Sequence, residues 1–228
     1  MNFYKEVFLN LFAKIISVFF HPLFILFYLF LLLHIIVPEQ FIFSGPRQGT
    51  AVHLLVFGLS IFFPLISTLA FRSIGLISSL QMEDKQERIG PMIATIIFYV
   101  WLYMNYQSFG VGPDIFRATI LGSLLALALA FLINNFSKIS LHTVGMGGLI
   151  GAVTIYRFVI PRESYDLYFG SSYLAFSPNW LLALTIVLAG MVGSSRMILD
   201  AHKGEDVYGG YLIGFIAQII AYRLFDLL

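Results

Sequence analysis

Residues Ser195 to Asp206, S-R-M-I-L-D-A-H-K-G-E-D, form the stretch on which the interpretation of this chain depends. The stretch lies between two long apolar segments, and it holds five charged residues and a histidine in a chain that is only 11% charged. Charge beside a membrane span is costly unless it is paired or functional. We therefore take this stretch as the centre of a candidate active site and ask which other segments join it.

The composition is that of a membrane protein. The 228 residues are 59% hydrophobic and have a mean hydropathy of +0.90, whereas a soluble domain is about 45–50% apolar and about 25% charged. We expect an integral, multi-pass protein of a bacterial inner membrane. The net charge of +1 gives no indication of a nucleic-acid partner. The absence of cysteine excludes disulfides, thiolate nucleophiles and cysteine-based metal sites.

Seven apolar runs approach the roughly 20 residues that a membrane-spanning helix needs. They cover about 15–37, 52–71, 92–109, 116–133, 141–160, 180–199 and 208–225. The sequence shows no repeat or linker, so we expect one domain over residues 1–228. The predicted fold is all-α, a polytopic bundle of six to seven transmembrane helices. The glycines of the fifth and seventh runs are expected to let helices pack closely.

The N-terminal residues form a distinct segment. Residues 1–14 mix apolar positions with charge, which is typical of an amphipathic helix lying at the membrane interface. His21-Pro22 is expected to mark either a kink or the true start of the first span. His21, His34 and His53 lack nearby polar partners in the sequence, and we interpret all three as structural histidines.

The order of the seven runs brings the polar segments to one side of the membrane. If the N-terminus lies on side A, then segments 72–91, 134–142 and 196–207 lie there too, and these three hold most of the polar chemistry. Side B receives the charges near Arg162, which we interpret as loop residues. Side A carries eight Lys and Arg residues against five on side B, but three of the eight belong to the proposed site. Whether side A faces the cytoplasm therefore stays open.

The residue types on side A suit a phosphoryl group. Asp206 lies four residues after His202, which is about one turn if this Gly204-containing stretch is helical, and its carboxylate can then orient the imidazole and leave the other ring nitrogen nucleophilic. Arg196 offers a planar set of donors that matches phosphate oxygens. His142 is a second imidazole, available as a general acid. Further donors come from Lys85, Arg88, Ser140 and Ser195.

The motif around His202 resembles one in a known family. Ser195-Arg196, His202 and Asp206 stand at the spacing of the third signature of the type 2 phosphatidic acid phosphatase superfamily, which is Ser-Arg, five residues, His, three residues and Asp. Ile139-Ser140-Leu141-His142 is similar to the second signature, Pro-Ser-Gly-His, and keeps its Ser and His.

The first signature of that family, Lys, six residues and Arg-Pro, is matched less well. Arg88 occupies the Arg position, but Gln81 stands at the Lys position and Ile89 at the Pro position. Lys85 and Pro91 lie nearby. The resemblance covers about residues 81–210 and implies a type 2 phosphatidic acid phosphatase-like core.

The resemblance implies a metal-independent hydrolase of phosphoric monoesters or diphosphates that needs no cofactor. By that analogy His202 attacks phosphorus and forms a phosphohistidine, Asp206 orients His202, and His142 protonates the leaving alkoxide and then activates water. The phosphate-binding residues would be Arg88, Lys85, Ser140, Ser195 and Arg196. The substrates implied are lipid phosphates: an isoprenyl diphosphate, phosphatidic acid, phosphatidylglycerol phosphate or a lipid A phosphate.

Two other functions fit the same basic cluster. A lipid transporter binds a phosphate head without cleaving it, although its site is expected near the bilayer midplane rather than at span ends. A non-catalytic phospholipid-binding protein is the other alternative. No histidine–carboxylate cluster has the spacing of a zinc-binding helix, so we predict no catalytic metal. The sequence leaves the oligomeric state open.

Overall fold

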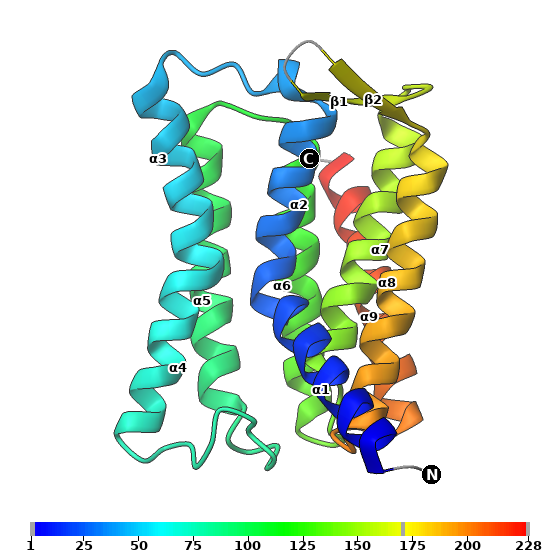
Figure 1. Cartoon of the computed structure of the whole chain (residues 1–228). Coiled ribbons are helices and arrows are strands. Elements are labelled where there is room, and N and C mark those ends of the chain that lie inside the picture. The colour runs from blue at the N-terminus through cyan, green and yellow to red at the C-terminus, as the bar shows by residue number, and fades with distance from the viewer. Residues whose placement is uncertain (1–2, 170–171, 227–228) are drawn as a thin grey trace.

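Helices run between the two ends of the molecule in this computed structural model, which describes residues 3–169 and 172–226 (Figure 1). Their bounds are α1 (Phe3–Phe19), α2 (Pro22–Ile36), α3 (Pro46–Phe57), α4 (Phe63–Ser73), α5 (Ile89–Phe109), α6 (Asp114–Asn134), α7 (Leu141–Val159), α8 (Pro178–Ile198) and α9 (Gly204–Asp226). A short 3₁₀ helix, η1 (Pro38–Gln40), follows α2, and a π-helical segment, η2 (Gly58–Phe62), joins α3 to α4.

Five helices of the described chain are long and apolar enough to cross a membrane. They are Pro46–Ser73, which joins α3, η2 and α4, then α5, α6, α8 and Gly204–Phe225 in α9. The bent pair α1–α2 makes a sixth if it forms one span. These helices are compatible with the predicted multi-pass membrane protein.

The fifth predicted run, 141–160, is also a helix, α7, but it is not among the candidate spans. Its buried residues include Gly147, Gly148 and Gly151, which add little apolarity and let neighbouring backbones approach. A Cβ atom at Gly147 would collide with the Tyr211 backbone of α9, and one at Gly214 with the Val144 carbonyl of α7. The predicted close packing of these two helices is therefore confirmed, and α7 is enclosed by protein.

The first run is broken rather than continuous. α1 and α2 meet at an angle of 59°, and Pro22 is the first residue of α2. The break predicted at His21-Pro22 is therefore present, as a bend between two helices with Pro22 at the start of the second. On α1, large apolar side chains such as Phe8, Leu11 and Val18 are exposed, and the helix packs chiefly against α8.

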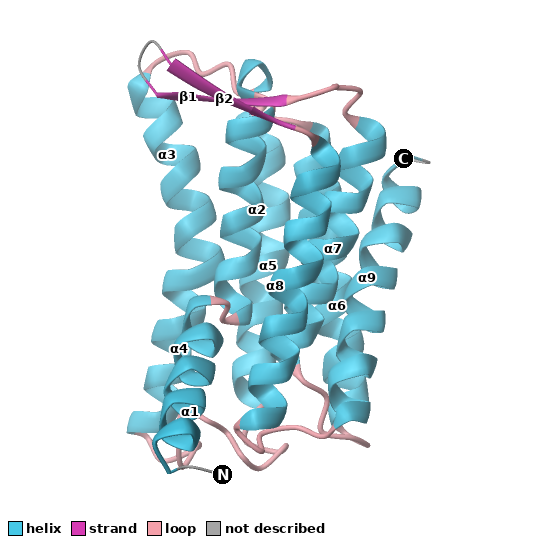
Figure 2. Ribbon diagram, turned by 45° about the vertical axis from the view of Figure 1, so that its right-hand side comes forward, coloured by secondary structure: helices cyan, strands magenta, loops and turns pink. Residues whose placement is uncertain are grey.

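The all-α prediction is wrong in one segment. Strands β1 (Tyr165–Phe169) and β2 (Ser172–Phe176) pair antiparallel between α7 and α8, and Figure 2 shows this hairpin lying across one end of the bundle. The hairpin lies on side B, away from the N-terminus (Figure 1). Arg162 forms an ion pair with Glu39 on this side.

The predicted sidedness of the polar segments holds in the structure. The α4–α5 loop, the α6–α7 loop and the α8–α9 loop all lie at the end that carries the N-terminus (Figure 1). The turn between the third and fourth runs lies at the other end, where Gly110 and Gly112 adopt φ angles of 61° and 84°. Such positive φ angles are open to glycine at little cost. Three sequence-distant polar segments thus share side A.

Candidate active site

The stretch 195–206 forms a sharp turn between two helices. At the end of α8, Ala201 N–H donates to the Arg196 carbonyl at 3.1 Å and Asp200 N–H to the Met197 carbonyl at 3.0 Å. Asp200 has a φ of 50°, so this is a Schellman motif closed by a left-handed residue. The turn reverses the chain within a few residues. It therefore brings Arg196, on the last turn of α8, and His202, just before α9, to the same cavity.

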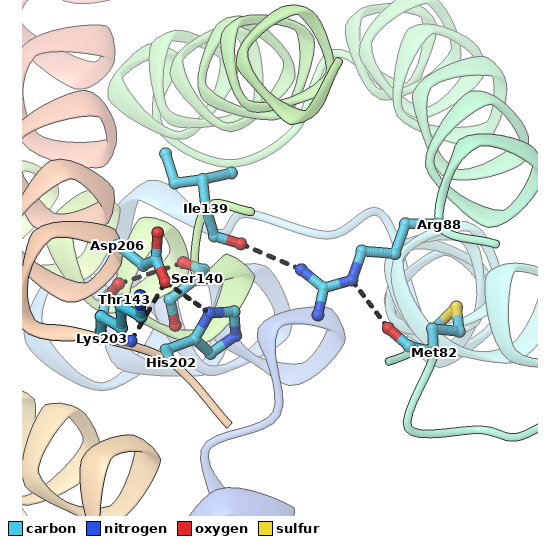
Figure 3. A network of polar contacts seen from close by, with 8 residues as sticks. All are labelled: Met82, Arg88, Ile139, Ser140, Thr143, His202, Lys203 and Asp206. Carbon is cyan, nitrogen blue, oxygen red and sulfur yellow. Dashed lines mark hydrogen bonds and ion pairs between the residues drawn. The ribbon is translucent and has the colours of Figure 1, made fainter. Parts of the chain in front are cut away.

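Asp206 has two roles at the start of α9. Its Oδ2 accepts the Lys203 N–H at 3.1 Å, which is half of a capping box. The same oxygen lies 3.6 Å from His202 Nδ1, as Figure 3 shows. The carboxylate thus faces Nδ1 of His202, which makes no hydrogen bond within the described residues, so Asp206 acts on this side of the ring by its charge and Nε2 lies on the other side.

Arg88 connects two loops of side A. It is only 6% exposed, and it donates from Nε to the Met82 carbonyl at 3.0 Å and from Nη1 to the Ile139 carbonyl at 3.1 Å (Figure 3). The first contact holds the α4–α5 loop and the second holds the segment before α7. These two bonds fix the guanidinium beside His202, where its charge acts on the imidazole.

His142 is held by the first helix. Its Nε2 lies 3.0 Å from the Ser17 carbonyl, and its ring lies 5.3 Å from that of His21, nearly perpendicular to it. Ser17 Oγ also lies 3.3 Å from Nη1 of Arg196. Ser17 and His21 were not among the predicted site residues, and the interpretation of His21 as purely structural does not fit its position beside His142.

A cavity of about 440 Å³ unites these side chains. Its polar lining includes Ser17, His21, Arg88, His142, Arg196 and His202. Its apolar wall includes Leu26, Leu29, Leu65, Met92, Ala126 and Val144. The cavity extends to Tyr99, ten residues into α5, which is about 15 Å along the helix and about half of a 30 Å hydrocarbon core. The shape suits an amphiphile with an anionic head.

The charges around the cavity favour a neutral His202 and an anionic ligand. Burial, together with the guanidinium groups of Arg88 and Arg196, lowers the pKa of His202 to about 4, although Asp206 acts in the opposite direction. A neutral imidazole is the nucleophilic form. Arg196 Nε is buried and makes no hydrogen bond within the described residues. A buried donor without a partner is costly, so a phosphate oxygen is a fitting partner for it.

The structure does not bring every predicted phosphate ligand to this cavity. Lys85 Nζ donates to the Asn135 carbonyl at 2.8 Å and lines a separate cavity with Asn134. Ser195 is buried, and its Oγ donates to the Met191 carbonyl within α8 at 2.8 Å. Their assignment as phosphate ligands stays a prediction that the geometry does not favour.

Ser140 takes an intermediate position. It is fully buried, its N–H donates to the Asp206 carbonyl at 3.3 Å, and its Oγ has no partner among the described residues (Figure 3). It does not line the cavity. Gln81, which stands at the Lys position of the first signature, does line it. An uncharged donor therefore occupies the place that the resemblance gives to a cation.

The remaining histidines lie on side B. The rings of His34 and His53 are 5.3 Å apart, and His53 Nδ1 lies 2.8 Å from the Gly49 carbonyl. Phe41 and Phe43 surround them. His34 Nδ1 is buried without a hydrogen-bond partner among the described residues, so the interpretation as a structural histidine fits His53 better than His34. Across the described residues no group of three or more His, Asp or Glu side chains is arranged to hold a metal ion.

In comparisons with known proteins, no protein-family model, no curated protein and no solved structure matches the chain.

Proposed function

We propose that this chain is a membrane lipid phosphatase that removes phosphate from a lipid phosphate or diphosphate through a phosphohistidine. The observation that carries the proposal is that His142, His202, Arg88 and Arg196 line one cavity whose remaining lining is mostly apolar. The phosphate head would lie among the four cationic or imidazole side chains, and the lipid tail would lie against α2 and α5.

The first chemical step transfers the phosphoryl group to His202. The Nε2 lone pair attacks phosphorus while the bond from phosphorus to the lipid oxygen breaks, and a protonated His142 gives its proton to that oxygen. The products are a lipid alcohol, or a lipid monophosphate from a diphosphate, and a phosphohistidine. Arg88 and Arg196 stabilise the charge on the phosphoryl oxygens, and Asp206 stabilises the positive charge that develops on His202.

The second step releases phosphate. His142, now neutral, takes a proton from water, the water oxygen bonds to phosphorus, and the bond between phosphorus and His202 Nε2 breaks. Inorganic phosphate leaves, and His142 is again protonated for the next cycle. The only reactant besides the lipid is water, so the scheme requires neither metal nor cofactor.

The test is phosphate release by purified protein in lipid nanodiscs from a panel of lipid phosphates and diphosphates. His202→Ala and His142→Ala should each reduce release by at least 10²-fold, in line with the usual contribution of a nucleophile or general acid (about 10²–10⁴-fold). The matched control is His34→Ala, which removes an imidazole that does not line the cavity. A phosphohistidine trapped on the wild type should be missing from His202→Ala.

The outcome also separates the rival functions. Tight binding of a lipid phosphate without release would favour the non-catalytic binding protein. Movement of intact lipid phosphate between the leaflets of a vesicle would favour the transporter. Undiminished release by His202→Ala would refute the assignment of the nucleophile.

A further inference from the structure

The end of α1 leaves one backbone carbonyl free for the site. In a continuing helix the Ser17 carbonyl would accept the N–H of His21, four residues on. Pro22 has no N–H, and the His21 N–H donates instead to the Val18 carbonyl at 3.3 Å. The Ile16 carbonyl keeps its helical hydrogen-bond partner, and the Phe19 carbonyl accepts a hydrogen bond from the Tyr28 hydroxyl at 3.0 Å.

His142 forms a hydrogen bond with the remaining carbonyl of this last turn, that of Ser17. A carbonyl oxygen only accepts, so the 3.0 Å contact between Ser17 O and His142 Nε2 requires the proton to lie on Nε2. Nδ1 of a neutral His142 then carries the lone pair, and it makes no hydrogen bond with any residue that the structure describes. Because His142 lines the cavity, Nδ1 is the nitrogen left to meet a ligand.

Two further contacts tie α1 to the same site. Ser17 Oγ lies 3.3 Å from Arg196 Nη1, where only the guanidinium can donate. His21 accepts the Leu23 N–H on Nδ1 at 3.4 Å, so a neutral His21 carries its proton on Nε2. His21 lines the cavity beside His142, with the two ring centres 5.3 Å apart.

We infer that the break between α1 and α2 completes the site, with Ser17 as the positioning residue for His142 and Arg196. The carbonyl of Ser17 accepts the Nε2 proton of His142, which fixes the tautomer of that ring and leaves Nδ1 for chemistry. His142 exchanges protons through Nδ1, and His202 reacts through Nε2. The inference deepens the proposed function and rests on it for the kinetic effects, but the tautomer of His142 is independent of any activity.

The decisive measurement is the ¹⁵N chemical shift of both ring nitrogens of His142 in histidine-labelled protein at a pH where the ring is neutral. The chain has five histidines, so the spectrum of His142→Gln assigns the signals. We expect the form protonated on Nε2. A wild-type His142 protonated on Nδ1 would overturn the inference.

Pro22→Ala tests the origin of the free carbonyl. It restores an N–H at position 22, so the helix can continue and the His21 N–H can return to Ser17. We expect His142 to become a mixture of tautomers and kcat to fall about tenfold, with a smaller change in KM. Pro64→Ala, in a span but outside the cavity, is the matched control. An unchanged tautomer and kcat in Pro22→Ala would contradict the inference.

Ser17→Ala tests the side chain while it keeps the carbonyl. We expect KM for a lipid phosphate to rise about tenfold, as for the loss of one hydrogen bond to a charged group, with kcat and the tautomer of His142 unchanged. Ser60→Ala, another buried serine, is the control and should leave KM unchanged. A KM within twofold of wild type in Ser17→Ala would refute the contact with Arg196.

Failure of this inference about Ser17 can be told apart from failure of the proposed phosphatase function. Wild-type protein that releases no phosphate from any lipid would refute the phosphatase. The ¹⁵N shifts would still decide whether Ser17 fixes the tautomer of His142.

Discussion

Asp206→Asn isolates the charge that faces His202. The amide oxygen of the substituted side chain can still accept the Lys203 N–H, so the cap at the start of α9 is preserved. What is lost is the negative charge 3.6 Å from His202 Nδ1. The variant should therefore fold normally and bind lipid phosphate, yet react slowly.

The size of the effect follows from the distance and the burial. Two unit charges 3.6 Å apart interact by about 5 kcal/mol at an effective dielectric constant of 20 and by about 1 kcal/mol in water. The side chains of His202 and Asp206 are only 3% and 15% exposed, which favours the larger figure. Since the proposed mechanism makes His202 positively charged as it bonds to phosphorus, we expect kcat to fall about 10²–10³-fold, or about 3–4 kcal/mol.

The assay is single-turnover phosphate release, with trapping of the phosphohistidine to separate its formation from its hydrolysis. Glu205→Gln is the matched control, because it removes the same charge from the same helical turn at an exposed position. The control should retain full activity. A kcat for Asp206→Asn within threefold of wild type, at an unchanged melting temperature, would refute the role of this carboxylate.

Three further predictions follow from the same geometry. The pKa of His202 is about 4 in the folded protein against an ordinary 6.5. The stability that comes from keeping this ring neutral should therefore be fully present above pH 6.5 and fall by about 3 kcal/mol as pH drops toward 4. The free energy of unfolding of wild type and His202→Gln, measured across this range, tests the prediction, and equal pH slopes for the two proteins would contradict it. Gly214→Ala should lower the melting temperature because its Cβ meets the Val144 carbonyl, whereas Gly209→Ala, with no atom near its Cβ, should not. Phosphate release should continue in excess EDTA because Arg88 and Arg196 supply the positive charge, and a tenfold loss that added metal restores would show a metal requirement.

The sequence predicted the parts of the site that depend on order along the chain. The alternation of apolar runs placed the segments of Arg88, His142 and His202 on one side, and the structure agrees. The spacing of His202 and Asp206 predicted that the carboxylate could reach the imidazole if the stretch were helical. The two side chains do lie 3.6 Å apart, but α9 begins only at Gly204, so the non-helical turn before it, and not helical periodicity, sets the position of His202. The prediction of sidedness succeeded because hydropathy is a local property.

The rest depends on contacts that no local pattern encodes. Ser17 meets His142 across 125 residues, and nothing in the sequence around Ser17 distinguishes it from a packing serine. Lys85 seemed a natural phosphate ligand by its position near Arg88, but the loop turns it toward Asn135. The hairpin was missed because an interhelical segment was assumed to be a loop, although two short runs rich in Tyr, Phe and Leu flanking Gly170-Ser171 are a hairpin signal.

The backbone contact between α7 and α9 determines which parts of the site can adjust to a ligand. Gly210 lies against the Ser140 carbonyl, and Gly214 against that of Val144, so sliding one helix past the other would force main-chain atoms together. His142 and Asp206 therefore form a fixed frame. Adjustment to an entering ligand is therefore left to the parts of the cavity wall outside this frame, such as α1, with its angled junction to α2, and the end of α8 that carries Arg196.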